Sequence, residues 1–404
     1  MSKTYDSELY SLLCDIWGYS ETAFEEKKSC ARMVEFLREQ GFEVTTPIAG
    51  MDTAYVGVYG SGKPVICFLA EYDALHGMSQ EADACRYAPL SSEERGHGCG
   101  HHLLGTGAIG AALLYRDYLK EHGVSGTVKI VGCPAEESGS GKAYLARSGF
   151  FDDADAALTW HPSNYHMVDT GSSQACIQAF FDFHGVSSHA AAAPHLGRSA
   201  LDAVEIMDVG SNYLREHMEP AERVHYAIIN SGGQSPNVVQ AEARVKYLIR
   251  STSAKKVKKL YERVCDVARG AALITGTTVD IIFDEGLYDT MPNFALEDVL
   301  RESYLKVGIP EYTKEEREYA GKFKASFDEE ELFADLPIAV KDIMALKDNI
   351  MESELCDMFV DRIHSEECAP GSTDVGDVSW VVPTAQIRVN CYSYGAGAHS
   401  WQWT

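Results

Sequence analysis

The chain has 404 residues, more than one compact core usually organises, so we expect two domains. It carries 35 lysines and arginines against 60 aspartates and glutamates, giving a formal net charge of −25. A surface of this sign repels phosphate backbones and anionic membranes, which argues against nucleic acid or a membrane as a partner. No run of about 18 apolar residues occurs, so no membrane span is predicted.

The cellular compartment is predicted from the first residues and from the cysteines. The opening segment, MSKTYDSELY, has neither the apolar core nor the small-residue cleavage site of a secretory signal. The 11 cysteines, an odd number, lie in apolar surroundings such as Val65-Ile66-Cys67-Phe68. Free buried thiols are therefore expected rather than disulfides, and the expected compartment is the reducing cytoplasm.

The first half of the chain alternates between two hydrophobic periods. Apolar spacing predicts two amphipathic helices in the first forty residues, one with Leu12 and Ile16 on its apolar face and one with Met33 and Leu37. Beyond them, strands are expected at 53–60, 64–70, 127–133 and 155–160, and helices at 103–120 and 141–148. Alternating strands and helices predict an α/β fold with a mostly parallel sheet.

A second pattern begins near residue 175. Its predicted elements are a strand at 175–184, a helix at 199–216, strands at 224–230 and 238–250, a helix at 255–273 and a strand at 277–284. This βαββαβ order is the split-βαβ, ferredoxin-like arrangement, with helices on one face of an antiparallel sheet. We therefore predict an inserted domain at 174–287, with the first domain formed by 1–173 and 288–404. Residues 311–365 are acidic and helical, and no chemistry is predicted for them.

The densest chemical signal is the segment 96–102, which reads GHGCGHH. Thiolate and imidazole are preferred ligands of zinc and similar divalent ions, and glycines let the backbone bring such side chains round one centre. A surface loop with solvated histidines is the alternative interpretation. The combination of cysteine, histidine and glycine favours a metal site.

A second signal, CPAEESG, follows an apolar strand and contains the adjacent carboxylates Glu136 and Glu137. Open α/β sheets keep their active sites at the carboxyl ends of their strands. One carboxylate can bind a metal while its neighbour acts as general base to the attacking water. An ordinary acidic loop is the alternative, because acidic residues are abundant in this chain.

Three further segments are ambiguous when taken singly. His161 follows the apolar run Ala-Leu-Thr-Trp, Asp73 follows another strand in AEYDAL, and His399 lies between glycines near the end of the chain. A lone histidine at the end of a strand is more often structural than catalytic. Together, however, these side chains follow successive strands of one α/β domain, where they are expected to converge.

At these residues the chain resembles the di-metal metallopeptidase family that includes glutamate carboxypeptidase, aminoacylase and the plant auxin-conjugate hydrolases. The motifs are most similar to its aminobenzoyl-glutamate hydrolase branch. They are GHGCGH, CPAEE, ALTWHP, SSHAAAAPHLGRSALDAV, SGGQSPNVVQ, YLIR and STDVGDVSW, and they span nearly the whole chain. The resemblance implies a catalytic α/β domain that carries an inserted dimerisation or lid domain.

The resemblance also implies two divalent metal ions per chain, zinc or manganese. By this resemblance Cys99 bridges the two ions, His101 and His161 complete the protein ligands of one, and Glu137 and His399 those of the other.

The remaining site residues implied by the resemblance act on the water or on the substrate. Glu136 would be the general base and acid, and Asp73 would orient a metal ligand. His189 would reach the active site of a partner subunit and stabilise the oxyanion. Asn237 and Arg250, in the inserted domain, would hold the carboxylate end of the substrate.

The chain departs from the family at two places. His102 stands where relatives usually have Asp or Asn, so a spare imidazole is expected beside the ligands, where it could perturb metal choice or replace a ligand. The sequence also stops five residues after His399, where relatives continue with a further helix that would support this histidine.

The expected activity is hydrolysis of the amide bond of an N-acyl amino acid, with N-aroyl glutamates such as aminobenzoyl-glutamate favoured by the branch. A dipeptidase or another N-acyl-amino-acid hydrolase of the family is the alternative. A homodimer is expected, and the family also allows a paired A-type subunit. Two other classes stay open: a hydrolase in which Cys99 is the nucleophile, and a non-catalytic binding protein.

Overall fold

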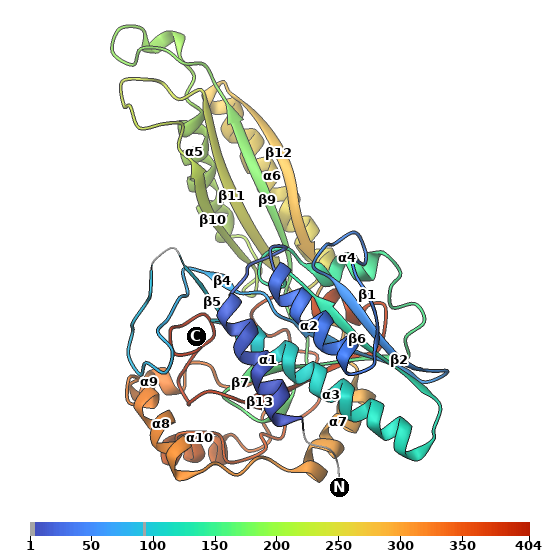
Figure 1. Cartoon of the computed structure of the whole chain (residues 1–404). Helices are drawn as coiled ribbons and strands as arrows, with labels where there is room; N and C mark the ends of the chain where they lie inside the picture. Colours follow the sequence, from blue (N-terminus) through green and yellow to red (C-terminus); the bar gives the residue numbers. More distant parts are fainter. Residues whose placement is uncertain (1–4, 92–93) are drawn as a thin grey trace. The chain divides into compact units, whose positions relative to one another are not determined.

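A computed structural model describes residues 5–91 and 94–404 (Figure 1). The chain forms two compact units. Unit 1 comprises Met1–Gly171, Met291–Glu367 and Asp377–Thr404, and unit 2 comprises Ser172–Thr290 and Cys368–Gly376. From the sequence, residues 368–376 were expected in the first domain instead. This short segment belongs to unit 2 because its backbone pairs with the chain that enters it: Ser172 and Cys368 form a β-bridge, and Gln174 N–H donates to the Gly371 carbonyl at 2.8 Å.

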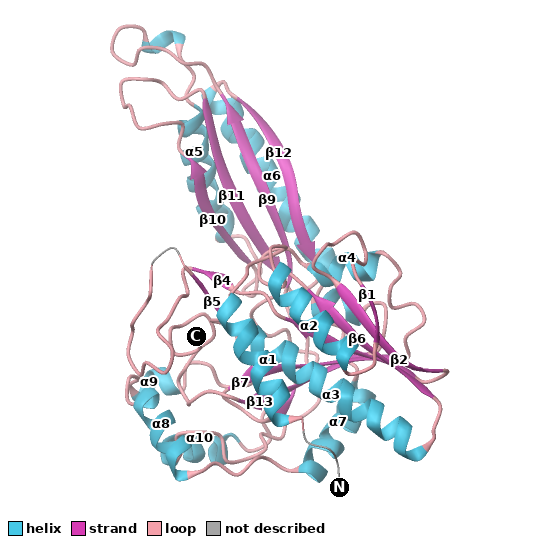
Figure 2. Cartoon of the chain, in the orientation of Figure 1, coloured by secondary structure: helices cyan, strands magenta, loops and turns pink. Residues whose placement is uncertain are grey.

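Unit 1 is built on a seven-stranded sheet in the order β1-β2-β6-β3-β7-β13-β8 (Figure 2). Its strands are β1 (Glu43–Thr45), β2 (Tyr55–Ser61), β3 (Val65–Glu71), β6 (Gly126–Cys133), β7 (Ala156–Ser163), β8 (Met167–Val168) and β13 (Thr384–Asn390). A separate short hairpin consists of β4 (Leu75–His76) and β5 (Arg95–Gly96). The central strands β6, β3, β7 and β13 are parallel to one another, whereas the outer pairings are antiparallel. The central parallel strands therefore end at one common edge.

Helices cover both faces of this sheet. The first group comprises α1 (Asp6–Tyr19), α2 (Lys27–Glu39) and α3 (His101–His122), which share one hydrophobic core with Val128 and Ile130 of β6. The other face carries Val131, which packs with Leu145 of α4 (Gly141–Arg147) in a second core. Residues of β6 separated by two thus share a face, as the strand period requires.

The acidic segment 311–365 forms a helical subdomain within unit 1. It contains α8 (Lys314–Lys324), α9 (Glu329–Leu332) and α10 (Ile343–Glu352), and it follows α7 (Phe294–Val307). Leu332, Leu346 and Ile350 pack with Tyr165 and Tyr394 in a small core of their own. Two of the helices begin with capping boxes, at Thr313 and Asp328, which explains why such polar sequences are helical.

Unit 2 is a four-stranded antiparallel sheet in the order β10-β11-β9-β12. Its elements are β9 (Ala175–His184), η1 (Pro194–Leu196), α5 (Ala200–Arg215), β10 (Arg223–Asn230), β11 (Glu242–Ser251), α6 (Ala254–Thr275) and β12 (Thr278–Leu287). Alternate residues of β9 and β11, such as Phe181 and Val245, pack with the two helices in a single core. A short helix α11 (Val375–Ser379) follows where the chain leaves unit 2.

The predicted fold class, a mostly parallel α/β sheet with a separate βαββαβ unit, is confirmed. Among the helices of residues 5–91 and 94–404, none is both long enough and apolar enough to cross a bilayer.

Candidate metal centre

Side chains from four segments of unit 1 meet at the carboxyl edge of its parallel strands. Asp73 follows β3, Glu136 and Glu137 follow β6, and the loop after β13 carries His399. His161 lies inside β7, which extends to Ser163, three residues beyond the predicted end of this strand. The predicted convergence is therefore present, although one ligand candidate is on a strand rather than after it.

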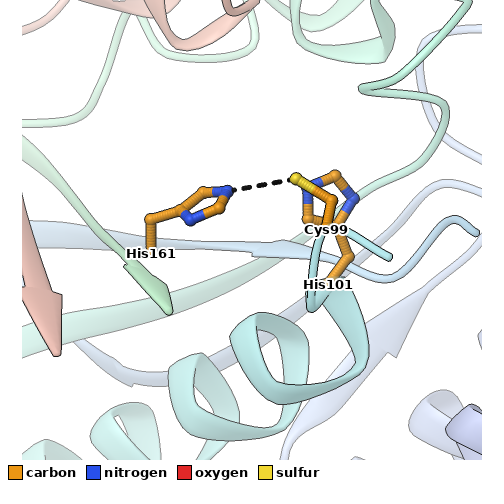
Figure 3. Close-up of side chains that lie close together, drawn as sticks. All are labelled: Cys99, His101 and His161. Atoms are coloured by element: carbon orange, nitrogen blue, oxygen red, sulfur yellow. Dashed lines mark hydrogen bonds between the residues drawn. The ribbon is translucent and has the colours of Figure 1, made fainter. Parts of the chain in front are cut away.

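Three groups of potential ligands are close enough to hold an ion. They are Cys99 with His101 and His161, Cys99 with Glu137 and His399, and Glu71 with His101 and Glu136; within each group the ligand atoms lie within 4.8 Å of one another. Figure 3 shows the first group: Cys99 lies in the loop just before α3, His101 is the first residue of this helix, and His161 faces them from β7. Cys99 belongs to two groups, so its sulfur can serve two ions.

The start of α3 places Cys99 and His101 on either side of Gly100. The backbone φ of Gly100 is +81°, and a Cβ at this position would lie 2.5 Å from the Tyr392 hydroxyl oxygen. Only glycine adopts this conformation readily and fits this space. The glycine in the motif is thus required for the turn that aims the thiol and the imidazole at one point.

Asp73 links two of the ligand-bearing segments. Its Oδ1 accepts a hydrogen bond from Nδ1 of His101 at 2.8 Å, and its Oδ2 accepts one from the backbone N–H of Glu137 at 2.9 Å. The first bond places a proton on Nδ1 of His101 and orients the ring, so that Nε2 is the nitrogen facing the other candidate ligands. One buried carboxylate therefore orients His101 and anchors the Glu136–Glu137 turn.

His161 is held in a form that can bind a metal. Its Nδ1 donates to the carbonyl oxygen of Pro162 at 2.7 Å, and its Nε2 lies 3.5 Å from the sulfur of Cys99. Burial, with Arg388 nearby, lowers the pKa of His161 to about 4. The ring is therefore neutral at physiological pH, and its Nε2 lone pair points at the shared centre.

Cys99 is a poor nucleophile in this environment. Burial raises the pKa of its thiol to about 12, and the nearby carboxylates of Glu137 and Glu136 act in the same direction. Reactive cysteines need the opposite, a surrounding that stabilises the thiolate. A divalent cation at this position would supply that stabilisation and would use the sulfur as a ligand.

Glu137 and His399 form, with Cys99, the second group of potential ligands. The backbone N–H of His399 donates to the Gly98 carbonyl at 2.7 Å, which ties its loop to the Cys99 segment. Its φ of +63° is unusual for a residue other than glycine, and such strain is common at functional sites. Burial would raise the pKa of Glu137, but the neighbouring His399 and His101 lower it to about 2, so this side chain is a carboxylate.

The arrangement fits divalent cations. Among the described residues, buried Nε2 of His101 has no hydrogen-bond partner although Oε2 of Glu71 lies 3.2 Å away, and neither has Oε1 of Glu137, which lies 3.2 Å from Nε2 of His399. Burial should lower the pKa of His101, yet the charges of Cys99 and Asp73 raise it well above its ordinary value. The site thus favours positive charge where unpaired ligand atoms converge.

His102 belongs to none of these three groups. Its ring lies against His97, with the ring centroids 4.8 Å apart, and its buried Nδ1 has no hydrogen-bond partner in the part of the chain that the structure describes. Burial lowers its pKa well below the ordinary value. The spare imidazole predicted from the sequence is thus neutral and packs against another histidine at a tilted angle.

Two buried residues of the centre have no assigned role in the sequence analysis. Glu71, at the end of β3, belongs to the third ligand group, and Lys142, in the first turn of α4, forms an ion pair with it at 2.6 Å. The signal for Glu71 is its position two residues before Asp73, since alternate residues of a strand share a face. Lys142 has no sequence signal that separates it from a surface lysine.

The remaining predicted residues lie in unit 2. His189 and Asn237 are exposed and adjacent: His189 pairs with Val238 in a β-bridge, and Ala190 N–H donates to the Asn237 carbonyl at 3.0 Å. The backbone N–H groups of Ala191 and Ala192 donate to Nδ1 of His189 at 3.2 and 3.1 Å. Nε2 of His189 therefore carries the proton and can donate it outward.

Arg250 lies at the other end of the unit 2 sheet. It is the penultimate residue of β11, whereas Asn237 precedes the first residue of this strand, Glu242. Eight residues of extended strand separate Glu242 from Arg250, roughly 27 Å. Within one chain, Asn237 and Arg250 therefore do not contact the same carboxylate.

Comparison with known proteins gives the family. Residues 67–400 match the sequence profile described as peptidase family M20/M25/M40. The chain belongs to this family. The B-type subunit of the p-aminobenzoyl-glutamate hydrolase of Escherichia coli (strain K12) is 42% identical over 404 residues, covering 98% of this chain and 84% of that protein. The Xaa-Arg dipeptidase of Mus musculus is 31% identical over 315 residues, covering 73% of this chain and 67% of that protein.

The solved structures agree with this assignment at the level of the fold. A Bacillus subtilis protein described as a dinuclear metal-binding peptidase of the M20 family superposes with a TM-score of 0.61 at 17% identity, covering 96% of this chain and 89% of that one. The resemblance predicted from the motifs is confirmed, and with it the enzyme class. This M20-family chain is a metal-dependent amidohydrolase, and the metals of its class are divalent.

Proposed function

We propose that this enzyme hydrolyses the amide bond of N-aroyl and N-acyl amino acids, with aminobenzoyl-glutamate as the type of substrate. The observation that carries this proposal is the 42% identity to the B-type subunit of p-aminobenzoyl-glutamate hydrolase across 98% of the chain. At this level of similarity a shared pocket is a reasonable expectation, whereas a fold alone would not specify a substrate.

The proposed ligand sets follow the geometry of the centre. One ion, zinc or manganese, would be held by Cys99, His101 and His161, and a second by Cys99, Glu137 and His399. This assignment is supported by the 4.8 Å limit within each set and by the cysteine that the two sets share. When bound, such a pair of ions lowers the pKa of water and polarises a carbonyl group.

Glu136 would move the protons of the reaction. Its carboxylate would take a proton from water as the oxygen attacks the amide carbon, and would then give the proton to the departing nitrogen. This second transfer is needed because an amide anion is a poor leaving group. A hydrogen bond holds the turn that carries Glu136 in place, because the backbone N–H of Ala135 donates to the side chain of buried Glu26 at 2.8 Å.

Arg250 would bind the free carboxylate of the substrate. Its Nε is buried and has no hydrogen-bond partner, and no ion pair to Arg250 is found among the residues described. A structural ion pair therefore does not account for this guanidinium. Its planar fork suits bidentate binding of a carboxylate, which would also attract an anionic substrate to a chain of net charge −25.

His189 and Asn237 would complete the active site of a partner subunit. The separation of Asn237 from Arg250 along β11 supports this arrangement, because two chains can bring both residues to one substrate and one chain does not. A homodimer is further supported by β10, an edge strand whose Tyr226, Ile228 and Ile229 are exposed. Unpaired edge strands with apolar side chains readily pair with another chain.

We expect subunit mixing to restore activity between two inactive variants. His189→Ala removes the outward Nε2 donor that would stabilise the oxyanion, and Glu136→Gln removes the base. In a mixed dimer, one of the two sites combines an intact Glu136 with an intact His189. Random exchange of equal amounts should therefore give about one quarter of the wild-type rate, measured as amide hydrolysis.

The control for this experiment is His195→Ala, which removes another exposed histidine of the same loop and should leave the rate unchanged. Exchange is followed with differently tagged chains. If exchanged mixtures recover no activity, His189 acts in its own subunit or not at all.

A dipeptidase is the second candidate, supported by the 31% identity to Xaa-Arg dipeptidase. Because the Escherichia coli relative is the B-type subunit of its enzyme, a paired A-type subunit is the alternative to a homodimer for this chain.

The test of the substrate is a hydrolysis screen of aminobenzoyl-glutamate, acyl amino acids and dipeptides with zinc- or manganese-loaded protein. Fastest turnover of aminobenzoyl-glutamate supports the proposal, and faster cleavage of dipeptides overturns it.

Two other classes are disfavoured by the centre itself. A cysteine-nucleophile hydrolase requires a thiolate, whereas burial raises the pKa of Cys99 to about 12. A non-catalytic binding protein would not need Glu136 beside the complete ligand sets, and absence of turnover on the whole panel would favour it.

We further propose the reducing cytoplasm as the compartment, because all 11 cysteines are free thiols.

A further inference from the structure

Glu26 is a buried carboxylate of unit 1 that lies outside the motifs described above. It immediately precedes α2 and is 0% exposed. A polar side chain at this position often caps the helix, but in the described part of the chain the side chain of Glu26 makes no such bond. Glu21 caps α2 instead, since its carboxylate accepts from the backbone N–H groups of Lys28 and Ser29 at 2.9 Å. Capping therefore does not explain why the carboxylate of Glu26 is buried.

The surroundings of Glu26 disfavour its negative charge. Burial raises the pKa of its carboxyl group to about 7, and the nearby carboxylate of Asp73 acts in the same direction. Hydrogen bonds, among them the one from the backbone N–H of Ala135, act in the opposite direction. A glutamine at this position would therefore avoid the cost of a buried charge and could still accept the same bond.

Two buried carboxylates hold the residues on either side of Glu136. Oε1 of Glu26 accepts a hydrogen bond from the backbone N–H of Ala135 at 2.8 Å. Oδ2 of Asp73 accepts one from the backbone N–H of Glu137 at 2.9 Å. Glu136 lies between these two anchored residues, so its backbone is held at both ends.

The backbone of Ala135 requires such an anchor. Its φ is +59°, in the left-handed region, which a residue with a Cβ adopts at an energetic cost. Such a conformation persists only where the surrounding structure holds it. Ala135 is 0% exposed, so water does not replace a lost partner of its N–H group. Without the acceptor on Glu26, we expect the turn to relax and the carboxylate of Glu136 to shift.

The segment that carries Glu26 is itself bound to the turn after β3. Thr22 forms a parallel β-bridge with Ala74, and the backbone N–H of Ala74 donates to the carbonyl oxygen of Glu21 at 2.8 Å. Ala74 directly follows Asp73. The anchor of the Glu136 turn is therefore connected to the turn that carries Asp73.

We propose that Glu26 is a positioning residue for amide hydrolysis, which acts through the Ala135 N–H to hold Glu136 where it can move the proton. This inference rests on the role of Glu136 proposed above. Asp73 differs from Glu26 because it also orients His101, a candidate metal ligand. Loss of Glu26 should therefore slow the proton transfers and leave the ions bound, whereas loss of Asp73 should disturb both.

The first test removes the acceptor and keeps the approximate volume of the side chain, in the full metal-loaded chain. Glu26→Met should lower kcat about 10- to 100-fold, while KM for aminobenzoyl-glutamate and the number of bound ions stay at the wild-type values. Glu26→Gln, whose amide oxygen can still accept from Ala135, should retain most of the wild-type rate. Glu297→Met is the matched control: it removes another buried glutamate of unit 1, 5% exposed, and should leave kcat unchanged.

A second test determines whether Glu26 acts through Glu136. In Glu136→Gln the base is already absent, so adding Glu26→Met should not lower the residual rate further. A role in stability alone would lower the rate by the same factor in both backgrounds. An equal fall in both backgrounds, or loss of metal in Glu26→Met, would therefore overturn the inference.

Glu26→Asp keeps the inference testable if Glu26→Met fails to fold. Its carboxylate is one methylene shorter and withdraws from the Ala135 N–H, so kcat should again fall at unchanged metal content. Wild-type kcat in whichever of these two variants folds, or a Glu26→Gln variant as slow as Glu26→Met, would overturn the role of Glu26 alone. Full turnover by Glu136→Gln would overturn the proposed base and this inference together.

Discussion

Replacing Glu136 with glutamine is expected to lower kcat about 10²- to 10⁴-fold while the metal content stays at the wild-type value. The amide keeps the shape of the side chain but can neither accept the proton of water nor return it to the leaving nitrogen. Because the ions would be held by other side chains, they should remain bound. Turnover and metal content are measured on the same preparation.

The adjacent variant Glu137→Gln is the matched control. Here a carboxylate whose pKa is lowered to about 2 is replaced by a neutral group, so a charged ligand is lost. This variant should lose metal, and its activity should fall in step with that loss and recover partly at high metal concentration. If Glu136→Gln lost metal and Glu137→Gln kept it, the two roles would have to be exchanged.

Arg250→Ala is expected to lower kcat/KM for an N-acyl glutamate about 30- to 1000-fold, mainly through KM. This range corresponds to roughly 2–4 kcal/mol for the loss of a charge-assisted pair in a closed site. Arg250→Lys should recover only part of the loss, since lysine keeps the charge but not the two-pronged geometry. The measurement is steady-state kinetics on the acid and on its neutral amide.

The neighbouring strand offers a matched control for the Arg250 variants. Arg223 pairs with Arg250 in the register of β10 and β11, and its guanidinium donates to the carbonyls of Pro220 and Glu222. Arg223→Ala should leave the preference for the acid over the amide intact, whereas Arg250→Ala should abolish it. Equal losses on both substrates in Arg250→Ala would identify Arg250 as structural.

The sequence was sufficient to predict the fold class and to predict that the candidate metal ligands meet at one edge of the sheet. Strand ends can be located from hydrophobic period, and parallel strands bring the residues that follow them to one edge. Cys99, His101 and Glu137 therefore meet as expected, although His161 lies within β7. The glycine beside His101 also indicated the tight turn before α3, because Gly100 adopts a positive φ and packs closely against Tyr392.

Other features depend on distances that no local pattern encodes. The resemblance implies that Asn237 and Arg250 both hold the carboxylate of the substrate, and it does not show that Asn237 precedes β11 whereas Arg250 lies near the end of this strand. Glu71 and Lys142 are about seventy positions apart in the sequence, and their pairing follows from the packing of α4 against the Glu136 turn. His102 is adjacent to a ligand in sequence, but the helix turns its ring towards His97.

The most direct test of the proposed two-ion amidohydrolase combines metal content with turnover. Protein stripped by a chelator is reloaded with zinc or manganese in steps, and hydrolysis of aminobenzoyl-glutamate is measured at each step. We expect stripped protein to be inactive and activity to rise until close to two ions per chain are bound. Full turnover by the metal-free protein would contradict the account.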